Sequence, residues 1–515
     1  MSADLPRFVV AAPASGHGKT TVATGLMLAL RRAGLRVSGH KVGPDYIDPG
    51  YHALATGRPG RNLDPHLVGE DRIVPLLRHG ASAEAGGPAA GVGASSGAPA
   101  GPADVAVIEG VMGLYDGHIG GDGFASTAHV AELTGSPVIL VVDISHASRS
   151  IAAVVLGMAT YEPGIRIAGV VLNKAGSERH SDEVRRALAP QGIPVLGVLH
   201  RDDNVTAPSR HLGLVPAAER PEAARSLDHL AERVAASLDL EAVMRIARSA
   251  PSLAGAPWDA AEALAGVGGG GADVLAGDSG AGADDNDDDT ARPRIAVAGG
   301  RAFTFRYAET VELLEAAGCW VAPFDPLADE ALPEGTAGIY LGGGFPEVHA
   351  AELSANGPML SSLGAAIAAG TPTVAECAGL LYLCRTVDGS PMVGAVPADA
   401  AMAPRLTLAY RRSTAPADSV LAAAGTEVTG HEFHRTAVTP SAGVPSVESV
   451  RDMAPAWTSP AGPEGFAGAS LHASYLHTHW AGHPALARRF ADHAHHFATH
   501  PRFATHPRLQ DMHLQ

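Results

Sequence analysis

The sequence predicts two α/β domains, the first of them built on a parallel sheet with helices on both faces. The chain has 515 residues, which is more than one hydrophobic core usually serves. Short β-branched runs alternate with Ala- and Leu-rich stretches of helical length, and this alternation is typical of parallel sheets. It stops at a Gly- and Asp-rich segment and then resumes, so two separate sheets are expected.

The predicted elements follow one another in regular order. The first domain, residues 1–250, has expected strands at 7–12, 36–42, 104–109, 137–143, 165–172 and 193–198. Its expected helices lie at 19–34, 124–134, 148–160, 180–189 and 222–237. The second domain, residues 293–497, has expected strands at 295–298, 338–341 and 372–375, and helices at 307–318 and 484–497.

Three segments are predicted to lie outside these cores because their composition is poor in large apolar residues. Residues 80–103 form an expected low-complexity surface loop, and residues 251–292 form an expected flexible acidic linker. The tail 498–515 is His-rich and contains part of a repeated Phe-Ala-Thr-His-Pro-Arg hexapeptide. A short tandem repeat of this kind is more typical of an unselected extension than of a metal-binding site, although metal delivery through the tail stays an alternative.

Charge and cysteine content narrow the class of protein. The net charge of −17 argues against nucleic acid as the main partner, although seven of the acidic residues are aspartates between Asp273 and Asp289. Three cysteines cannot form a disulfide framework in a chain of this length, which indicates a reducing compartment. The opening apolar run 8–12 is too short for a signal peptide, and no stretch has transmembrane length. We therefore expect a cytoplasmic protein without a membrane partner.

A phosphate-binding loop is predicted at residues 14–21, Ala-Ser-Gly-His-Gly-Lys-Thr-Thr, between a strand and a helix. Gly16 and Gly18 allow backbone N–H groups to converge on phosphates at the N-terminus of the helix. Lys19 is expected to pair with the β- and γ-phosphates of ATP, and Thr20 is expected to reach Mg²⁺. Thr21 is also expected to be a nucleotide-binding residue. The first glycine of the usual pattern is replaced by Pro13.

Carboxylates follow the next two predicted strands. Asp45 and Asp48 lie in Lys-Val-Gly-Pro-Asp-Tyr-Ile-Asp-Pro, and Glu109 ends the third strand. Because ligands bind at the carboxyl ends of parallel strands, Asp48 and Glu109 are predicted to hold Mg²⁺ with Thr20. The alternative is that Asp45 and Asp48 only cap a turn and a helix. Asn173, after a later strand, resembles a base-recognition residue, although Asn is also a common turn residue.

The second domain carries a predicted nucleophile, Cys377, at the turn between a strand and a helix. The helix N-terminus is expected to favour the thiolate, and His477 is the predicted proton acceptor. Backbone N–H groups of Gly343 and Gly344, which follow another strand, are predicted to form an oxyanion hole. The alternative role for a lone cysteine, a small buried hydrophobe, is assigned to the two other cysteines, Cys319 and Cys384.

Taken together, these motifs resemble the cobyrinic acid and hydrogenobyrinic acid a,c-diamide synthase family over nearly the whole chain. The most specific stretches are 40–49, 57–65, 109–113, 430–434 and 473–477. The sister family, cobyric acid synthase, has Lys-Pro-Gln-Asn-Met where this chain has Lys-Val-Gly-Pro-Asp at 41–45. That difference makes the sister family a poor match.

The resemblance implies an N-terminal synthetase domain similar to dethiobiotin synthetase and a C-terminal class I glutamine amidotransferase domain. It implies that ATP, Mg²⁺ and L-glutamine serve to amidate the a and c acetate carboxylates of a corrin polycarboxylate in cobalamin biosynthesis, through an acyl phosphate. Asp45, Tyr46 and Asp48 would bind this substrate, and the protein would be a homodimer.

The chain departs from the family at three positions. His479 stands where related amidotransferases have a glutamate, so the group that orients His477 is left open. Ala378 replaces a glycine after the nucleophile, and His66 replaces an aromatic residue. Two other functions stay open: a diamide synthase for nickel-sirohydrochlorin, and a switch ATPase of the same nucleotide-loop superfamily. The sequence does not distinguish a cobalt-containing corrin from a cobalt-free one.

Overall fold

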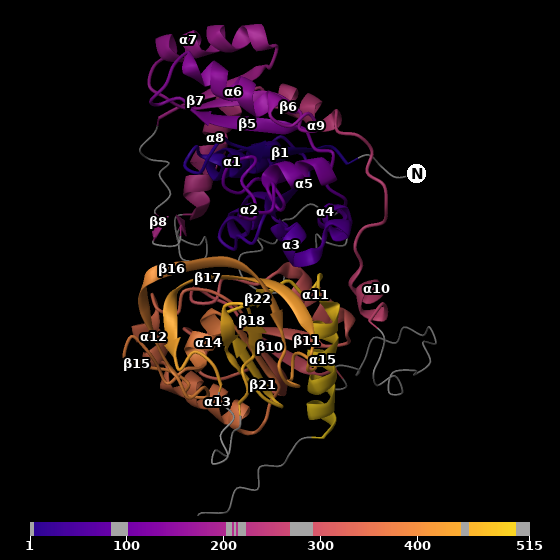
Figure 1. Cartoon of the computed structure of the whole chain (residues 1–515), viewed down its shortest axis with the longest axis vertical. Helices are drawn as coiled ribbons and strands as arrows, with labels where there is room; N and C mark the ends of the chain where they lie inside the picture. Colours follow the sequence, from indigo (N-terminus) through magenta and orange to yellow (C-terminus); the bar gives the residue numbers. More distant parts are fainter. Residues whose placement is uncertain are drawn as a thin grey trace, which may run out of the picture.

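Two α/β domains stacked along the long axis make up the computed structural model of the chain (Figure 1). The structure describes residues 5–83, 101–201, 209–210, 213–214, 223–267, 292–443 and 453–500. Most of the predicted loop at 80–103, the part of the predicted linker from 268 to 291 and the end of the tail lie outside these residues. No helix among the described residues is long and apolar enough to cross a membrane.

The first domain is a seven-stranded sheet in which every neighbouring pair is parallel. Its order is β3-β2-β4-β1-β5-β6-β7. The strands are β1 (Arg7–Ala11), β2 (Val37–Val42), β3 (Arg61–Leu63), β4 (Val105–Glu109), β5 (Val138–Asp143), β6 (Ile167–Ala175) and β7 (Val195–His200). This order places the carboxyl ends of β1, β2 and β4 side by side, so the loops that follow them share one edge of the sheet.

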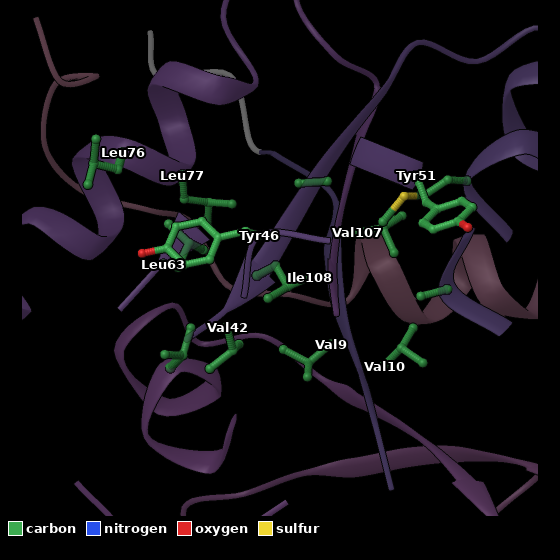
Figure 2. Close-up of a cluster of buried hydrophobic side chains, with 14 of the residues drawn as sticks. Val9, Val10, Val42, Tyr46, Tyr51, Leu63, Leu76, Leu77, Val107 and Ile108 are labelled. Carbon is green, nitrogen blue, oxygen red and sulfur yellow. The ribbon is translucent and has the colours of Figure 1, made fainter. Parts of the chain in front are cut away.

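Helices cover this sheet, and the core between the layers is apolar. They are α1 (Lys19–Arg32), α2 (Asp48–Thr56), α3 (Pro65–Val68), α4 (Ile73–Gly80), α5 (Thr127–Leu133), α6 (Ser150–Thr160), α7 (Glu178–Leu188), α8 (Ala223–Ser237) and α9 (Leu240–Arg248). Figure 2 shows part of the core, which includes Val9 and Val10 of β1, Val107 and Ile108 of β4, and Leu76 and Leu77 of α4. All six strands and five helices predicted for this domain are present, whereas α2, β3, α4 and α9 were not predicted.

The second domain is built on a six-stranded sheet in the order β11-β10-β12-β13-β21-β20. Its strands are β10 (Arg294–Ala298), β11 (Trp320–Phe324), β12 (Thr336–Leu341), β13 (Thr373–Glu376), β20 (Phe466–Ala467) and β21 (Leu471–Ser474), and only β20 runs antiparallel to its neighbour. The helices are α11 (Ala308–Ala316), α12 (Ala350–Ala355), α13 (Gly357–Ala368), α14 (Ala378–Leu383) and α15 (Pro484–Thr499). The predicted strands and helices of this domain are present.

A long antiparallel ribbon, which was not predicted, lies on the side of the second domain that faces the first (Figure 1). It consists of β16 (Asp399–Thr414) and β17 (Glu427–Thr439), with β14 (Thr386–Val387), β15 (Ser390–Pro391) and β22 (His477–Thr478) beside it. The ribbon contacts the first domain directly, because the Tyr410 hydroxyl donates to Asp64 Oδ2 at 2.6 Å. The motif at 430–434 therefore lies at the domain interface.

The prediction of a flexible linker is wrong for residues 251–267. Leu253, Trp258 and Leu264 are buried, and the Trp258 backbone N–H donates to the Pro75 carbonyl at 2.9 Å. Helix α10 (Ala260–Ala265) then packs against α11 and α15 of the second domain. We call residues 251–267 the strap; Figure 1 shows it running along one side from α9 to α10. Its few large apolar residues are enough to anchor it, although Gly, Ala and Pro dominate its composition.

A buried ion pair also joins the domains. The Arg61 guanidinium, 1% exposed, bonds Glu309 Oε1 at 2.7 Å and Glu312 Oε1 at 2.5 Å. His79 Nε2 lies 3.0 Å from the other oxygen of Glu312. Because both partners of Arg61 come from α11, this cluster fixes the orientation of one domain against the other.

Replacing Arg61 with alanine is expected to lower the free energy of unfolding by about 3–5 kcal/mol, since the buried Glu309 and the partly buried Glu312 lose their counter-charge. Urea unfolding followed by circular dichroism measures this loss. The matched control is Arg149→Ala, which removes a pair with Glu183 in which Arg149 is 74% exposed and which should cost at most about 1 kcal/mol. Equal losses in the two variants would contradict the structural role of Arg61.

Candidate active sites

The predicted phosphate-binding loop connects β1 to α1 and has the required backbone. Gly16 and Gly18 have φ angles of 84° and 90°, which L side chains rarely adopt. A Cβ atom on Gly18 would lie only 2.3 Å from Asn173 Nδ2. Lys19, Thr20 and Thr21 form the first turn of α1, as predicted. The loop thus presents its backbone and the helix N-terminus at the carboxyl edge of the sheet.

Residues at the ends of β5 and β6 hold this loop in place. Asn173 Nδ2 donates to the His17 carbonyl at 2.8 Å, and Lys174 Nζ donates to the Gly16 carbonyl at 2.7 Å. Lys174 is also paired with Asp143 at 2.8 Å. Asn173 is therefore brought to the nucleotide loop, where its side-chain amide supports the backbone.

Lys19 reaches across the loop toward the segment after β4. Its Nζ donates to the Met112 carbonyl and, at 3.3 Å, to the Ala14 carbonyl. Burial lowers the pKa of Lys19 to about 8. A phosphate anion beside this ammonium would offset the cost of burying it, so the lysine is suited to a triphosphate.

The predicted metal ligands converge on one point. Thr20 Oγ1 donates to Glu109 Oε1 at 2.5 Å and to Asp48 Oδ2 at 3.2 Å. A hydroxyl and two carboxylates are hard oxygen ligands, which suit Mg²⁺ completed by phosphate and water oxygens. Among the described residues, no group of three or more His, Cys, Asp or Glu side chains is arranged to hold a metal by itself. Thr20, Asp48 and Glu109 thus fit Mg²⁺ as part of its ligand set.

Lys41 is the central cation of this cluster and was not predicted as a site residue. Its Nζ lies 2.5 Å from Asp48 Oδ2, 2.9 Å from Glu109 Oε1 and 3.9 Å from Asp45 Oδ2. Burial lowers the pKa of Lys41, but the three carboxylates outweigh burial and keep it above its ordinary value. His52 is the second residue missed; its Nε2 lies 2.7 Å from Glu109 Oε2, in a fully buried pair.

These contacts set the charge of the carboxylates. Burial alone would raise the pKa of Glu109, but Lys41 and the hydrogen bond with His52 lower it below its usual range. Asp45 has the local role given above as the alternative, because its Oδ1 accepts the backbone N–H groups of Ile47 and Asp48 at 2.8 and 3.0 Å. Its second oxygen, Oδ2, is the atom near Lys41.

In the second domain, Cys377 lies at a strained turn between β13 and α14. Its φ of 50° and ψ of −96° are rare for a residue with a side chain. The Cys377 N–H donates to the Ser474 carbonyl at 2.7 Å, and the Gly379 N–H donates to the Gly342 carbonyl at 3.1 Å. This geometry is that of the predicted nucleophile elbow, which raises the sulfur out of the sheet edge.

His477 lies beside this elbow. The next residue, Thr478, donates its backbone N–H and its hydroxyl to Glu376 Oε1, at 3.2 and 2.9 Å. Glu376 directly precedes Cys377 in the chain. On the other side, a Cβ atom on Gly343 would lie 2.6 Å from His477 Cε1. The structure therefore gathers Cys377, His477 and the glycine segment in one place.

The expected thiolate is not the resting form of the nucleophile. Burial raises the pKa of Cys377 above its ordinary value, and the hydrogen bond from the Ala378 N–H does not offset this. Burial, together with His431 and His434, lowers the pKa of His477 well below 6.5. Both pKa shifts favour the uncharged forms, a Cys377 thiol and a neutral His477 imidazole. The six-residue helix α14 is too weak a dipole to reverse the cost of burial.

This charge state predicts the pH dependence of glutamine hydrolysis. His477 acts as a base only when neutral, and its lowered pKa keeps it neutral as pH falls through 6.5. We expect kcat/KM for glutamate release to stay level from pH 7.5 down to 6.5 and to fall only at lower pH. Enzyme returned from each pH to 7.5 should recover its activity, which controls for unfolding. An acid limb centred at or above pH 6.5 would contradict this charge state.

One predicted oxyanion donor is already occupied. The Gly343 N–H donates to the Phe305 carbonyl at 2.9 Å, and the Phe305 N–H donates back to Gly343 at 3.0 Å. The prediction for Gly343 is therefore wrong for the structure as it stands. Among the described residues, the Gly344 N–H has no such acceptor, and the Ala378 N–H points to the sulfur. These two groups are the remaining donors.

The residue at the position of the missing glutamate turns away from His477. His479 stacks on Tyr307 with ring centroids 4.1 Å apart, and its Nε2 lies 3.7 Å from Glu309. Tyr46, predicted to bind substrate, is instead buried between the domains against His477, with centroids 4.7 Å apart. That prediction is corrected: the Tyr46 ring is an interdomain contact.

Comparisons with known proteins agree with this division into two sites. Residues 8–215 match a family described as the CobQ/CobB/MinD/ParA nucleotide binding domain, and residues 294–485 match the CobB/CobQ-like glutamine amidotransferase domain. Hydrogenobyrinate a,c-diamide synthases of Thermobifida fusca and Streptomyces coelicolor are 56% and 52% identical, over 95% of this chain and 97% of each relative. Cobyrinate a,c-diamide synthase of Dehalococcoides mccartyi is 37% identical over 96% of this chain and its own full length.

Proposed function

The chain belongs to the family of hydrogenobyrinate and cobyrinate a,c-diamide synthases, and we propose that its own substrate is the cobalt-free acid, hydrogenobyrinic acid. It is an amidotransferase ligase with a nucleotide-binding and a glutamine amidotransferase domain. The observation that supports the cobalt-free acid is identity: five relatives named for hydrogenobyrinate are 47–56% identical, against 37–40% for three named for cobyrinate. A switch ATPase would leave the amidotransferase domain without a purpose.

In the first domain, a substrate carboxylate oxygen attacks the γ-phosphorus of ATP, the bond to the β-phosphate oxygen breaks, and ADP leaves. Lys19 pairs with the phosphates, while Thr20, Asp48 and Glu109 would hold Mg²⁺, which supplies positive charge as the phosphoryl group is transferred. Lys41 and His52 keep the Glu109 carboxylate ionised, and Lys41 also holds Asp48 in place. The product is an acyl phosphate; ammonia attacks its acyl carbon, phosphate leaves, and loss of a proton gives the amide.

In the second domain, the Cys377 sulfur attacks the carboxamide carbon of glutamine while its proton passes to His477. The N–H groups of Gly344 and Ala378 would stabilise the oxyanion that forms. His477 returns the proton to the departing nitrogen, ammonia leaves, and water then hydrolyses the thioester to glutamate. Tyr46, in the loop after β2, packs against His477 of the second domain, and this contact supports internal passage of ammonia from one site to the other.

The test is mass spectrometry of corrin products after incubation with Mg-ATP, glutamine and either hydrogenobyrinic or cobyrinic acid. Two successive carboxylate-to-amide mass shifts that depend on ATP are expected, with hydrogenobyrinic acid converted faster. Faster conversion of cobyrinic acid would reverse the assignment of substrate. ATP hydrolysis without either shift would favour another tetrapyrrole, such as nickel-sirohydrochlorin. We also propose a cytoplasmic homodimer, which light scattering of the purified protein would test.

A further inference from the structure

Tyr46 belongs to the carboxylate loop of the first domain, but its side chain packs against residues of the second. It stands between Asp45 and Asp48, and only 8% of its surface is exposed. Its ring stacks on Phe305 with centroids 4.9 Å apart and an interplanar angle of 20°. It also meets the His477 ring at 4.7 Å and an angle of 40°. One aromatic side chain thus connects the carboxylate loop, which we also call the acceptor loop, with His477, the predicted base of glutamine hydrolysis.

The hydroxyl of Tyr46 is also held in place, by hydrogen bonds with two residues of the second domain. The Tyr307 hydroxyl donates to the Tyr46 oxygen at 3.0 Å, and this oxygen lies 3.2 Å from His431 Nδ1. Because Tyr307 supplies the first proton, the Tyr46 proton is free to go to His431. Burial lowers the pKa of His431 to about 3, so its ring is neutral and can accept. His431 on β17 is the register partner of His477 on β22.

The His477 ring has no polar group that orients it at Nε2. This nitrogen is buried and has no hydrogen-bond partner among the described residues. The residue two positions on, His479, is turned to Tyr307 and Glu309. Packing therefore sets the angle of the imidazole, between Gly343 on one side and Tyr46 with His431 on the other.

The loop that carries Tyr46 is also held by residues of the first domain. Asn62 Nδ2 donates to the carbonyls of Gly43 and Asp45, at 2.8 and 2.6 Å. Asp48, two residues after Tyr46, is a predicted metal ligand and bonds Lys41. A nucleotide, metal or carboxylate that shifts these acids must shift the Tyr46 backbone, because only one residue separates them.

We propose that Tyr46 is the positioning residue of His477, so that the base for glutamine hydrolysis is correctly placed only while the acceptor loop is seated. This proposal rests on the assignment of Cys377 and His477 to glutamine hydrolysis. Release of ammonia by the second domain would then depend on the first domain, which consumes it. The coupling arises because the loop that carries Tyr46 has a seated and an unseated position, and ligands of the first domain stabilise the seated one. Tyr46 also supplies the group that stands in for the absent glutamate.

The test compares Tyr46→Phe, Tyr46→Ala and, as a matched control, Tyr410→Phe, which removes an interdomain hydrogen bond to Asp64 from a ring that packs on His66 and His118. Glutamate release is measured with and without Mg-ATP and hydrogenobyrinic acid, and synthesis is measured with glutamine and with ammonium. A base misplaced by about 1 Å costs about 10²-fold in rate.

Tyr46→Ala is expected to lower kcat for glutamate release by about 10- to 100-fold with little change in KM, and to lower the ratio of glutamine- to ammonium-supported synthesis at least about 10-fold. The acid limb of this variant should move to higher pH. Without the tyrosine ring over it, the His477 imidazole is hydrated, and its pKa rises. Tyr46→Phe keeps the ring and should restore most of the rate, and Tyr410→Phe should leave the acid limb in place.

An unchanged ratio of glutamine- to ammonium-supported synthesis in Tyr46→Ala, or an unmoved acid limb, would overturn the role of Tyr46. Failure of the proposed substrate would look different. The unmodified protein would then convert cobyrinic acid faster, or amidate neither acid with ammonium, whereas glutamate release would still report on Tyr46.

Discussion

Cys377→Ala is expected to abolish glutamine-supported amidation, with a loss of at least about 10³-fold, because no other group can form the thioester. Synthesis from high concentrations of ammonium should continue, since the phosphate loop and its carboxylates lie in the other domain. Product amide is measured with each nitrogen source at saturating ATP, and glutamate release is measured separately.

The control for Cys377→Ala is Cys384→Ala, which alters a buried thiol in the same domain, seven residues along the chain. It should keep both activities, apart from the stability lost with a small cavity. If Cys377→Ala lost ammonium-supported synthesis and Cys384→Ala did not, the two activities would not reside in separate sites. Retained glutamate release in that variant would place the nucleophile elsewhere.

Glu109→Gln should reduce synthesis from either nitrogen source by at least about 10²-fold. The substitution removes a carboxylate that Thr20, Lys41 and His52 all contact. The loss should appear as a slower rate and as a higher Mg²⁺ concentration for half-maximal rate. Glutamate release without ATP should persist, because Glu109 is not part of the amidotransferase site.

Asp71→Asn is the matched control for Glu109→Gln, since the Asp71 carboxylate is 76% exposed and outside the carboxylate cluster. It should leave synthesis and the Mg²⁺ requirement unchanged. A thermal melt of each variant separates loss of the site from loss of the fold. Undiminished synthesis in folded Glu109→Gln would remove this residue from the phosphoryl-transfer site.

The elements that the sequence predicted correctly are those with strong local signals. Buried strands such as β4 are continuous β-branched runs, and α1 directly follows a glycine-rich loop. The ribbon was missed because β16 is half exposed and lacks a clean period-two pattern. Strand β3 has only three residues, Arg61–Leu63, and pairs only because β2 lies beside it.

The site residues show the same difference between those with a local sequence signal and those without one. Cys377 and the phosphate loop were predicted because each is defined by a strand, a turn and a helix that are contiguous in sequence. Asp45 and Asp48 lie close to Lys41 in sequence, but Glu109 is 68 positions away. The contacts of Tyr46 with Tyr307 and His431 span 261 and 385 positions, so no spacing rule could identify these contacts. The occupied N–H of Gly343 likewise depends on Phe305, which reaches it only after β10 and β12 have paired.

The strap changes where one domain ends. Helix α10 precedes the segment at 268–291 in the chain, yet it already packs on α11 and α15 of the amidotransferase domain. A polypeptide that stopped at residue 267 would therefore carry its own docking element, and one that began at residue 292 would carry the surface that receives it. The peptide connection between these points is not what joins the two halves. The two halves therefore contact each other as two subunits would, through α10 and through Arg61 with Glu309 and Glu312.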